Sequence, residues 1–386
     1  MTKINPYNFY FPTGYFQFHK KQLFNFQLNR FFSWGYAEYD DLITVGSRIH
    51  DFYDWKTEMT RLAETALSKG RLLNSAFYYR TAEFYTFSDD PDKEILYDKF
   101  SDLFYQAIKG DSYEKINIPY RNGFLPTLRL RTGSAKRGTI IIHGGFDSFI
   151  EEFYSIMKYF SNMGYEVVGF DGCGQGAALR KYGLTWQIEW EEPINTILDY
   201  FKLSNVTLFG LSMGGWLCLR ASAFEPRIKR VIADGHAIDY MKCYPYLIRI
   251  LHLWFMRQKR FEGFINKMAI KKAEAKNAQG WMTKQSMYIT VTDNPMMAFE
   301  KVWLAMNKEN IHSERVTQDV LLLSGKNDHF IPIKMHRLQI QALTNAKSVT
   351  DRIFTKEEHA QNHCQIGNVW LALDIIAKWI EEKGSV

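Results

Sequence analysis

The chain has 386 residues, more than the roughly 250–300 at which a single hydrophobic core stops growing, so we expect a main domain with accessory segments. Hydrophobic residues make up 46% and charged residues 23%, which is the balance of a soluble globular protein. The formal charge of +6 is small and spread out, with only short basic clusters at 257–260 and 271–272, so no nucleic-acid partner is expected.

The N-terminal segment and the cysteines predict where in the cell the protein is located. Residues 1–15 contain aromatic residues, Asn and Pro but no basic segment followed by an apolar one, so no signal peptide is predicted. No run of 18 residues lacks charge or strong polarity, so neither a membrane span nor a membrane partner is expected. The cysteines stand far apart with no CxxC pair, which predicts reduced thiols in a cytoplasmic protein. They are Cys173, Cys218, Cys243 and Cys364.

Residues 1–113 predict a helical lobe. Between 40 and 108, apolar and aromatic residues recur three or four positions apart, as they do along the buried face of a helix. The segments 68–70 and 88–92 are rich in Ser, Gly, Asp and Pro and predict turns between helices. No long period repeats, so the pattern indicates a lobe and not a solenoid.

From residue 113 the pattern changes to strands that alternate with helices. Asn122 and Gly123 predict the turn of a β-hairpin. The strands that follow are nearly all apolar, which is typical of a parallel sheet covered by helices on both faces, and we expect this sheet over 114–235. These strands are predicted at 139–143, 167–171, 206–209 and 231–234.

Residues 236–312 interrupt the alternation of strands and helices. Their apolar residues recur at helical spacing, which predicts a helical cap inserted into the sheet domain. Strands resume at 320–325 and 348–354, and a last helix is expected over 369–382. The segment 313–386 therefore completes an α/β core that also carries an N-terminal helical lobe.

A Gly-x-Ser-x-Gly motif, from Gly210 to Gly214, joins the strand at 206–209 directly to a helix. Glycines flank Ser212 because the serine backbone sits in a strained turn where neighbouring side chains would clash. Such a turn lifts the hydroxyl above the edge of the sheet and points a helix N-terminus at it. Ser212 is therefore the predicted nucleophile of a nucleophile elbow.

A serine hydroxyl is a weak nucleophile and needs a base that is oriented by an acid. Asp328 is the predicted acid, because it follows the strand at 320–323 and precedes the candidate histidines in the chain. His359 and His363 both lie between the last strand and the last helix, and His363 is favoured because it stands just before that helix. His329 is adjacent to the acid and is a poor candidate for the base.

Two backbone N–H groups are needed to bind an oxyanion. One is expected from Met213, directly after the nucleophile, and the other from the turn at 143–146 that follows the first buried strand. Both Gly145 and Phe146 are candidates for the second group, and Phe146 is favoured.

The loop at 171–176, with the sequence Asp-Gly-Cys-Gly-Gln-Gly, imitates a dinucleotide-binding loop. The third glycine of that fingerprint would fall at position 177, which is Ala177, and no acidic residue follows at the end of a second strand. We therefore expect this loop to pack beside the active site. No metal-ligand spacing such as HExxH is present, so neither a cofactor nor a metal is predicted.

Four of these segments together resemble one branch of the α/β-hydrolases. They are the run 143–148, the loop 171–176, the Ser212 motif and the segment 360–365. That branch carries an N-terminal helical domain, which residues 55–104 also resemble, and includes 2,6-dihydroxypseudooxynicotine hydrolase and the fungal polyketide-shortening hydrolases of pigment synthesis. The resemblance covers most of the chain and implies an α/β-hydrolase fold.

The resemblance also implies roles for single residues. It gives Ser212, Asp328 and His363 as a catalytic triad. Some members use an acidic residue right after the glycine turn when they cut a carbon–carbon bond beside a ketone, and Asp147 matches that position, where the nicotine-pathway enzyme has the longer Glu. Helical lobes in this branch often take part in dimer contacts, so a homodimer is expected.

The predicted activity is hydrolysis of a small organic acyl substrate, at a carbon–carbon bond beside a ketone or at an amide or imide nitrogen. The first alternative is a general carboxylesterase or peptidase that acts on small acyl compounds. An alternative of another class is a catalytically inactive hydrolase fold that binds a ligand.

Overall fold

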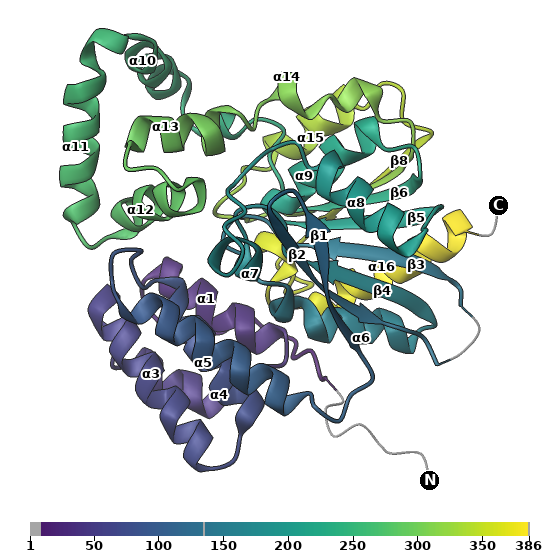
Figure 1. Cartoon of the computed structure of the whole chain (residues 1–386), viewed down its shortest axis with the longest axis horizontal. Helices are drawn as coiled ribbons and strands as arrows, with labels where there is room; N and C mark the ends of the chain where they lie inside the picture. The colour runs from purple at the N-terminus through teal and green to yellow at the C-terminus, as the bar shows by residue number, and fades with distance from the viewer. Residues whose placement is uncertain (1–8, 134–135, 385–386) are drawn as a thin grey trace.

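The structure is a computed structural model that describes residues 9–133 and 136–384. Five helices precede the sheet and lie together at one side of it (Figure 1). Their starts and turns follow local chemistry: the Asp51 carboxylate, for example, caps the third helix by accepting hydrogen bonds from two backbone N–H groups. The helices are α1 (Gln22–Ser33), α2 (Tyr39–Gly46), α3 (Phe52–Ser68), α4 (Leu72–Phe84) and α5 (Asp92–Ala107).

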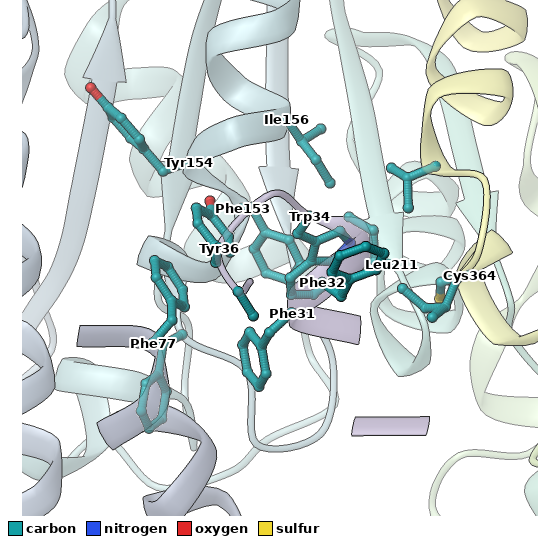
Figure 2. Close-up of a cluster of buried hydrophobic side chains, with 14 of the residues drawn as sticks. Phe31, Phe32, Trp34, Tyr36, Phe77, Phe153, Tyr154, Ile156, Leu211 and Cys364 are labelled. Carbon is teal, nitrogen blue, oxygen red and sulfur yellow. The ribbon is translucent and has the colours of Figure 1, made fainter. Parts of the chain in front are cut away.

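The N-terminal helices pack against the sheet domain through aromatic side chains. The Tyr36 ring stacks on Phe77 with 3.6 Å between ring centroids, and its hydroxyl accepts a hydrogen bond from the backbone N–H of Ser155 at 2.7 Å. Figure 2 shows Trp34 next to Phe153, whose ring lies 5.5 Å away edge to face. The helices and the sheet domain therefore share one buried aromatic cluster.

The aromatic residues before α1 pack mainly on their own chain. Phe11 and Phe18 are buried, and the Phe16 ring contacts Phe18 and Phe32 at 5.8 and 5.5 Å. Tyr10 is exposed. The homodimer stays a prediction, since these contacts do not decide it.

The sheet has eight strands in the order β1-β2-β4-β3-β5-β6-β7-β8. The hairpin of β1 and β2 and the pairing of β2 with β4 are antiparallel, and every other pairing is parallel. The predicted hairpin and the predicted α/β architecture are confirmed. The strands are β1 (Glu114–Tyr120), β2 (Gly123–Leu130), β3 (Gly138–His143), β4 (Tyr165–Phe170), β5 (Val206–Leu211), β6 (Ile228–Asp234), β7 (Asp319–Gly325) and β8 (Ser348–Phe354).

Helices cover both faces of the sheet. On one face, α6 and α16 share a hydrophobic cluster with the N-terminal helices, and on the other face α8, α9 and α15 form a second cluster. The strands β4 and β5 are fully buried and mostly apolar because both of their faces are covered. These helices are α6 (Tyr154–Asn162), α8 (Glu191–Phe201), α9 (Met213–Phe224), α15 (Lys334–Ala342) and α16 (Val369–Gly384). The short α7 (Gly176–Arg180) follows β4.

A group of helices lies between β6 and β7 and extends away from the sheet (Figure 1). Trp281 connects this cap to the N-terminal helices, because its indole N–H donates to the Phe84 carbonyl at 2.8 Å and its ring stacks on Phe84. None of the helices within the described ranges is both long and apolar enough to cross a membrane. The cap helices are α10 (Tyr246–Arg257), α11 (Glu262–Glu274), α12 (Ala278–Thr290), α13 (Pro295–Phe299) and α14 (Lys308–Ile311).

Candidate active site

Ser212 lies in a strained turn between β5 and α9. Its φ of +58° and ψ of −128° are unfavourable for a residue with a side chain, and the backbone N–H of Ser212 donates to the Asp234 carbonyl at 2.7 Å. A Cβ at Gly210 would lie 2.1 Å from the Gly214 carbonyl oxygen, and a Cβ at Gly214 would lie 2.7 Å from the Gly144 oxygen. The two glycines are therefore required for the turn to form.

The structure brings Ser212, His363 and Asp328 together at the carboxyl edge of the sheet. The His363 Nε2 lies 2.7 Å from the Ser212 Oγ, and the His363 Nδ1 lies 2.6 Å from the Asp328 Oδ2. The second carboxylate oxygen of Asp328 accepts hydrogen bonds from the backbone N–H groups of Phe330 and Ile331 at 2.8 and 2.9 Å. The acid is therefore fixed in position and orients the imidazole toward the serine.

Among the described residues, no other histidine is hydrogen-bonded to Ser212. His359 is exposed to solvent in a left-handed turn with a φ of +58°. The His143 ring is buried next to the Gly144 carbonyl at 3.0 Å, and burial lowers its pKa to about 4, so it is neutral and braces the glycine turn. His329 packs on Phe330 with 3.9 Å between ring centroids.

The pKa of His363 reflects two opposing effects. Burial is the largest single effect and lowers the pKa, but the charge and hydrogen bond of Asp328, together with Cys364, raise it, and the result lies well above the ordinary value of 6.5. A histidine that accepts the serine proton must be neutral. We therefore expect kcat/KM to increase with pH through a pKa above 6.5.

A pH–rate profile measures this expectation. Replacing Asp328 by Asn removes the charge that raises the pKa, so the rising limb of the residual activity should move to lower pH. A rising limb below 6.5 in the unaltered protein would contradict the effect assigned to Asp328.

The oxyanion hole predicted at Phe146 and Met213 stays a prediction, but a hydrogen bond narrows the choice of donor on the glycine turn. The Gly145 N–H donates to the Ser148 Oγ at 3.0 Å, which leaves the Phe146 N–H as the candidate on this loop, together with Met213 at the start of α9. Gln175 supports the loop by donating its side-chain amide to the carbonyl groups of Gly144 and Gly145 at 2.9 and 2.8 Å. The predicted packing of the 171–176 loop beside the site is confirmed.

Replacing Gly145 by Ala should damage this arrangement. The added Cβ would lie 2.7 Å from the Met213 nitrogen, so the loop must move away from the helix N-terminus. We expect kcat to fall by about 10²–10³, the effect of losing one oxyanion donor. The control is Gly110→Ala, because a Cβ at Gly110 meets nothing within 4 Å. Unchanged kcat in Gly145→Ala, beside a normal Gly110→Ala protein, would contradict this role of the loop.

A cavity of about 400 Å³ opens in front of Ser212. Side chains from α1, from the end of α4, from the cap and from the loops after the strands surround it, and most of them are apolar or aromatic. Of the described residues that line it, Arg30 is the one Lys or Arg, and none is Asp or Glu. The aromatic and polar members of the lining include Phe26, Gln27, Trp34, Phe84, Phe146, Tyr240, Trp281 and Trp303.

A network of buried charges lies behind this cavity. Glu152 pairs with both Arg30 and Arg80, and Arg80 also pairs with Glu83 on the same helix. Arg80 donates a further hydrogen bond to the backbone carbonyl of Asp147, the residue that follows Phe146. The N-terminal helices therefore hold the loop that carries the candidate oxyanion donor.

Asp147 belongs to this network and is not among the residues that line the cavity. The Gln285 side-chain amide, from α12 of the cap, donates to its Oδ1 at 2.9 Å, and Arg80 lies 3.7 Å from its Oδ2. Burial raises the pKa of Asp147 above its ordinary value, although Arg80 lowers it. The carboxyl group is therefore placed between the lobe and the cap.

Asp234 is a site residue that was not predicted. It ends β6 beside the elbow, its Oδ1 accepts a hydrogen bond from Gln365 at 2.9 Å, and burial raises its pKa to about 7. The signal was present in the sequence, because Asp234 ends a strand at the same edge of the sheet as Ser212. Over the part of the chain that the structure describes, no cluster of three His, Cys, Asp or Glu side chains could hold a metal ion.

The chain is similar in sequence to a known protein family and to fungal hydrolases. The family model described as alpha/beta hydrolase fold matches residues 140–362, more than half of the chain. Hydrolase LUC6 from Fusarium sp is 29% identical over 53% of this chain, and 20-hydroxy-prefusarin hydrolase FUS2 from Gibberella moniliformis is 31% identical over 53%. The matched region spans 57% of the length of each of these two relatives.

Solved structures share the fold over nearly the whole chain. The crystal structure of 2,6-dihydroxy-pseudo-oxynicotine hydrolase superposes with a TM-score of 0.63 and 17% identity, covering 92% of this chain and 93% of that one. AbyA5 gives a TM-score of 0.66 with 18% identity and covers 90% of both chains. Because these alignments cover at least 90% of the chain, they extend well beyond the sheet domain, and the predicted resemblance is confirmed.

Proposed function

We propose that this chain, which belongs to the α/β hydrolase fold family, is a hydrolase that cleaves an acyl group from a small organic substrate with Ser212 as the nucleophile. The observation that carries the proposal is the continuous relay from the Ser212 Oγ to the His363 Nε2 at 2.7 Å and from the His363 Nδ1 to the Asp328 Oδ2 at 2.6 Å. A nucleophile, a base and an orienting acid within these distances are the parts that acyl transfer requires.

In the proposed mechanism, His363 accepts the proton of Ser212 as the serine oxygen attacks the substrate carbonyl. Asp328 stabilises the imidazolium that forms, and the N–H groups of Phe146 and Met213 hold the oxyanion. His363 then donates the proton to the leaving group. A water molecule, activated by the same histidine, hydrolyses the acyl-enzyme and releases the acid.

The cavity favours a largely apolar substrate. Aromatic side chains from the lobe, the core and the cap line it, and Arg30, which is paired with Glu152, is its one Lys or Arg among the described residues. A leaving group that can hold negative charge, such as an enolate or an imide nitrogen, fits this combination. The relative FUS2 is named as a hydrolase of 20-hydroxy-prefusarin, a hydroxylated compound, which is consistent with this class.

The role of Asp147 as an auxiliary acid in carbon–carbon bond cleavage stays a prediction. Replacing Asp147 by Asn should lower turnover of a β-diketone and leave turnover of an activated ester nearly unchanged. An equal loss on both substrates would show instead that Asp147 supports the loop, through its contacts with Arg80 and Gln285.

A panel of β-diketones, N-acyl imides and nitrophenyl esters, followed by mass spectrometry of the products, tests the proposed function. We expect release of a carboxylic acid from the first two classes and slow turnover of simple esters. Fast turnover of nitrophenyl esters alone would favour a general carboxylesterase. No turnover of any class, with Ser212 unreactive toward a fluorophosphonate, would favour a ligand-binding protein without catalysis.

A further inference from the structure

The positive charge of this protein is concentrated in the outer part of the cap. Residues 244–276, here called the cap tip, contain eight Lys or Arg and two Asp or Glu, a net charge of +6. The rest of the chain holds 40 of the 48 basic and 40 of the 42 acidic residues, so it has no net charge. The expectation that the surplus is spread along the chain is therefore wrong.

The cap tip also exposes an unusual amount of apolar surface. Eleven of the 24 large hydrophobic residues that are exposed in the described chain lie within these 33 residues. On α10, the exposed fractions of Tyr246, Leu247, Ile248 and Leu251 are 65%, 77%, 55% and 58%, and these positions form one broad face of the helix. A broad apolar helix face that is exposed to water indicates a surface that binds another apolar phase.

Basic and apolar side chains alternate on the second helix of the tip. On α11, Phe264 and Met268 are exposed at 66% and 45%, and Lys267, Lys271 and Lys272 are exposed between and after them. No ion pair joins these three lysines to a carboxylate within the described residues. Figure 1 shows α10 and α11 at the end of the cap farthest from the sheet, where both are accessible.

We propose that the cap tip binds to the surface of a membrane that contains anionic lipids. Apolar side chains such as Leu247 and Phe264 would enter the boundary between headgroups and acyl chains, while the lysines bind the lipid phosphates. A second copy of the chain is a poor partner for this face, because two tips of charge +6 would repel each other. The expected absence of a membrane partner rested on the lack of a spanning segment, and a surface-bound cap needs none.

The cap tip begins at the wall of the cavity in front of Ser212. Tyr244, the first residue of the tip, lines the cavity in front of Ser212, together with Tyr240 and Cys243 directly before it. A bound tip would therefore hold the cavity wall close to the lipid surface, where apolar compounds concentrate. The binding itself does not depend on the chemistry at Ser212, so the two proposals can fail separately.

Sedimentation of the full-length protein with vesicles tests the proposal. We expect binding to vesicles of phosphatidylcholine mixed with phosphatidylglycerol, weak binding to phosphatidylcholine alone, and release at high salt. Lys267→Glu, Lys271→Glu and Lys272→Glu together should reduce binding by at least about tenfold. Absence of binding by the unaltered protein, or equal binding by this triple variant, would overturn the proposal.

A matched variant controls for net charge. Lys69, Lys109 and Lys229 are exposed outside the cap, and replacing all three by Glu makes the same change in total charge. This control should bind the anionic vesicles nearly as well as the unaltered protein. An equal loss in both triple variants would overturn the assignment to the cap tip, because total charge would then explain the binding.

A second variant tests the contribution of the apolar side chains of the cap tip to vesicle binding. Leu247→Ser with Leu251→Ser should weaken vesicle binding even at low salt, and both positions are exposed, so the fold should tolerate the change. Sedimentation equilibrium on the same proteins examines the alternative occupant. If the unaltered protein does not bind vesicles but forms a dimer, and the double variant dissociates that dimer, the proposal would be overturned in favour of a second copy of the chain.

Discussion

Replacing Ser212 by Ala should reduce kcat by on the order of 10⁴ or more and leave the fold unchanged. The loss should be this large because, in the proposed mechanism, the Ser212 Oγ forms the acyl-enzyme, and among the described residues no other hydroxyl is hydrogen-bonded to the His363 Nε2. The measurement is single-turnover hydrolysis of the best substrate from the panel, with thermal unfolding to verify stability.

Ser222→Ala is the matched control for this change. Ser222 lies on α9, the helix that starts directly after the nucleophile, and its hydroxyl donates to the Cys218 carbonyl at 2.7 Å, within the helix. Its removal should leave turnover nearly unchanged. If Ser212→Ala retained turnover within about tenfold of the unaltered protein, covalent catalysis by this serine would be refuted.

Replacing Asp328 by Asn should lower kcat by on the order of 10⁴ with little change in KM. The amide can donate a hydrogen bond to the His363 Nδ1, which would leave the proton on Nε2, facing Ser212, where the base must be free. The two backbone hydrogen bonds to the Oδ1 can still form, so the turn should keep its shape.

Asp234 offers the control for Asp328. It is also buried and near His363, but its Oδ1 accepts a hydrogen bond from Gln365 and has none to the histidine. Asp234→Asn should therefore cause a much smaller loss. If the two variants lost equal activity, or if Asp234→Asn lost more, the orienting acid would have to be reassigned.

Much of the fold could be predicted because buried parallel strands leave a strong local signal. The strand expected at 206–209 is β5 (Val206–Leu211), and the strand expected at 231–234 is β6 (Ile228–Asp234). In both cases a short apolar run of residues predicts the position of the strand, and the strand in the structure is longer by a few residues. The Gly-x-Ser-x-Gly turn was equally local, since the two glycines that it needs stand beside Ser212.

The polar network behind the cavity could not be predicted, because its partners are far apart in the chain. Arg80 and Glu152 are separated by 72 positions, and Gln285 and Asp147 by 138. One weak signal existed: Arg80 stands among aromatic residues on α4, where an arginine must be buried and paired. The choice between Gly145 and Phe146 also needed coordinates, because it depends on the hydrogen bond to Ser148.

Treatment of the folded protein with a fluorophosphonate tests the central claim most directly. The claim is that His363 and Asp328 activate the hydroxyl of Ser212, at the distances of 2.7 and 2.6 Å that the structure shows. Peptide mapping should find one phosphonyl group per chain on Ser212, with slower labelling in Asp328→Asn and none in Ser212→Ala. A folded protein that resists the reagent, or that carries the label on another residue, would contradict the claim.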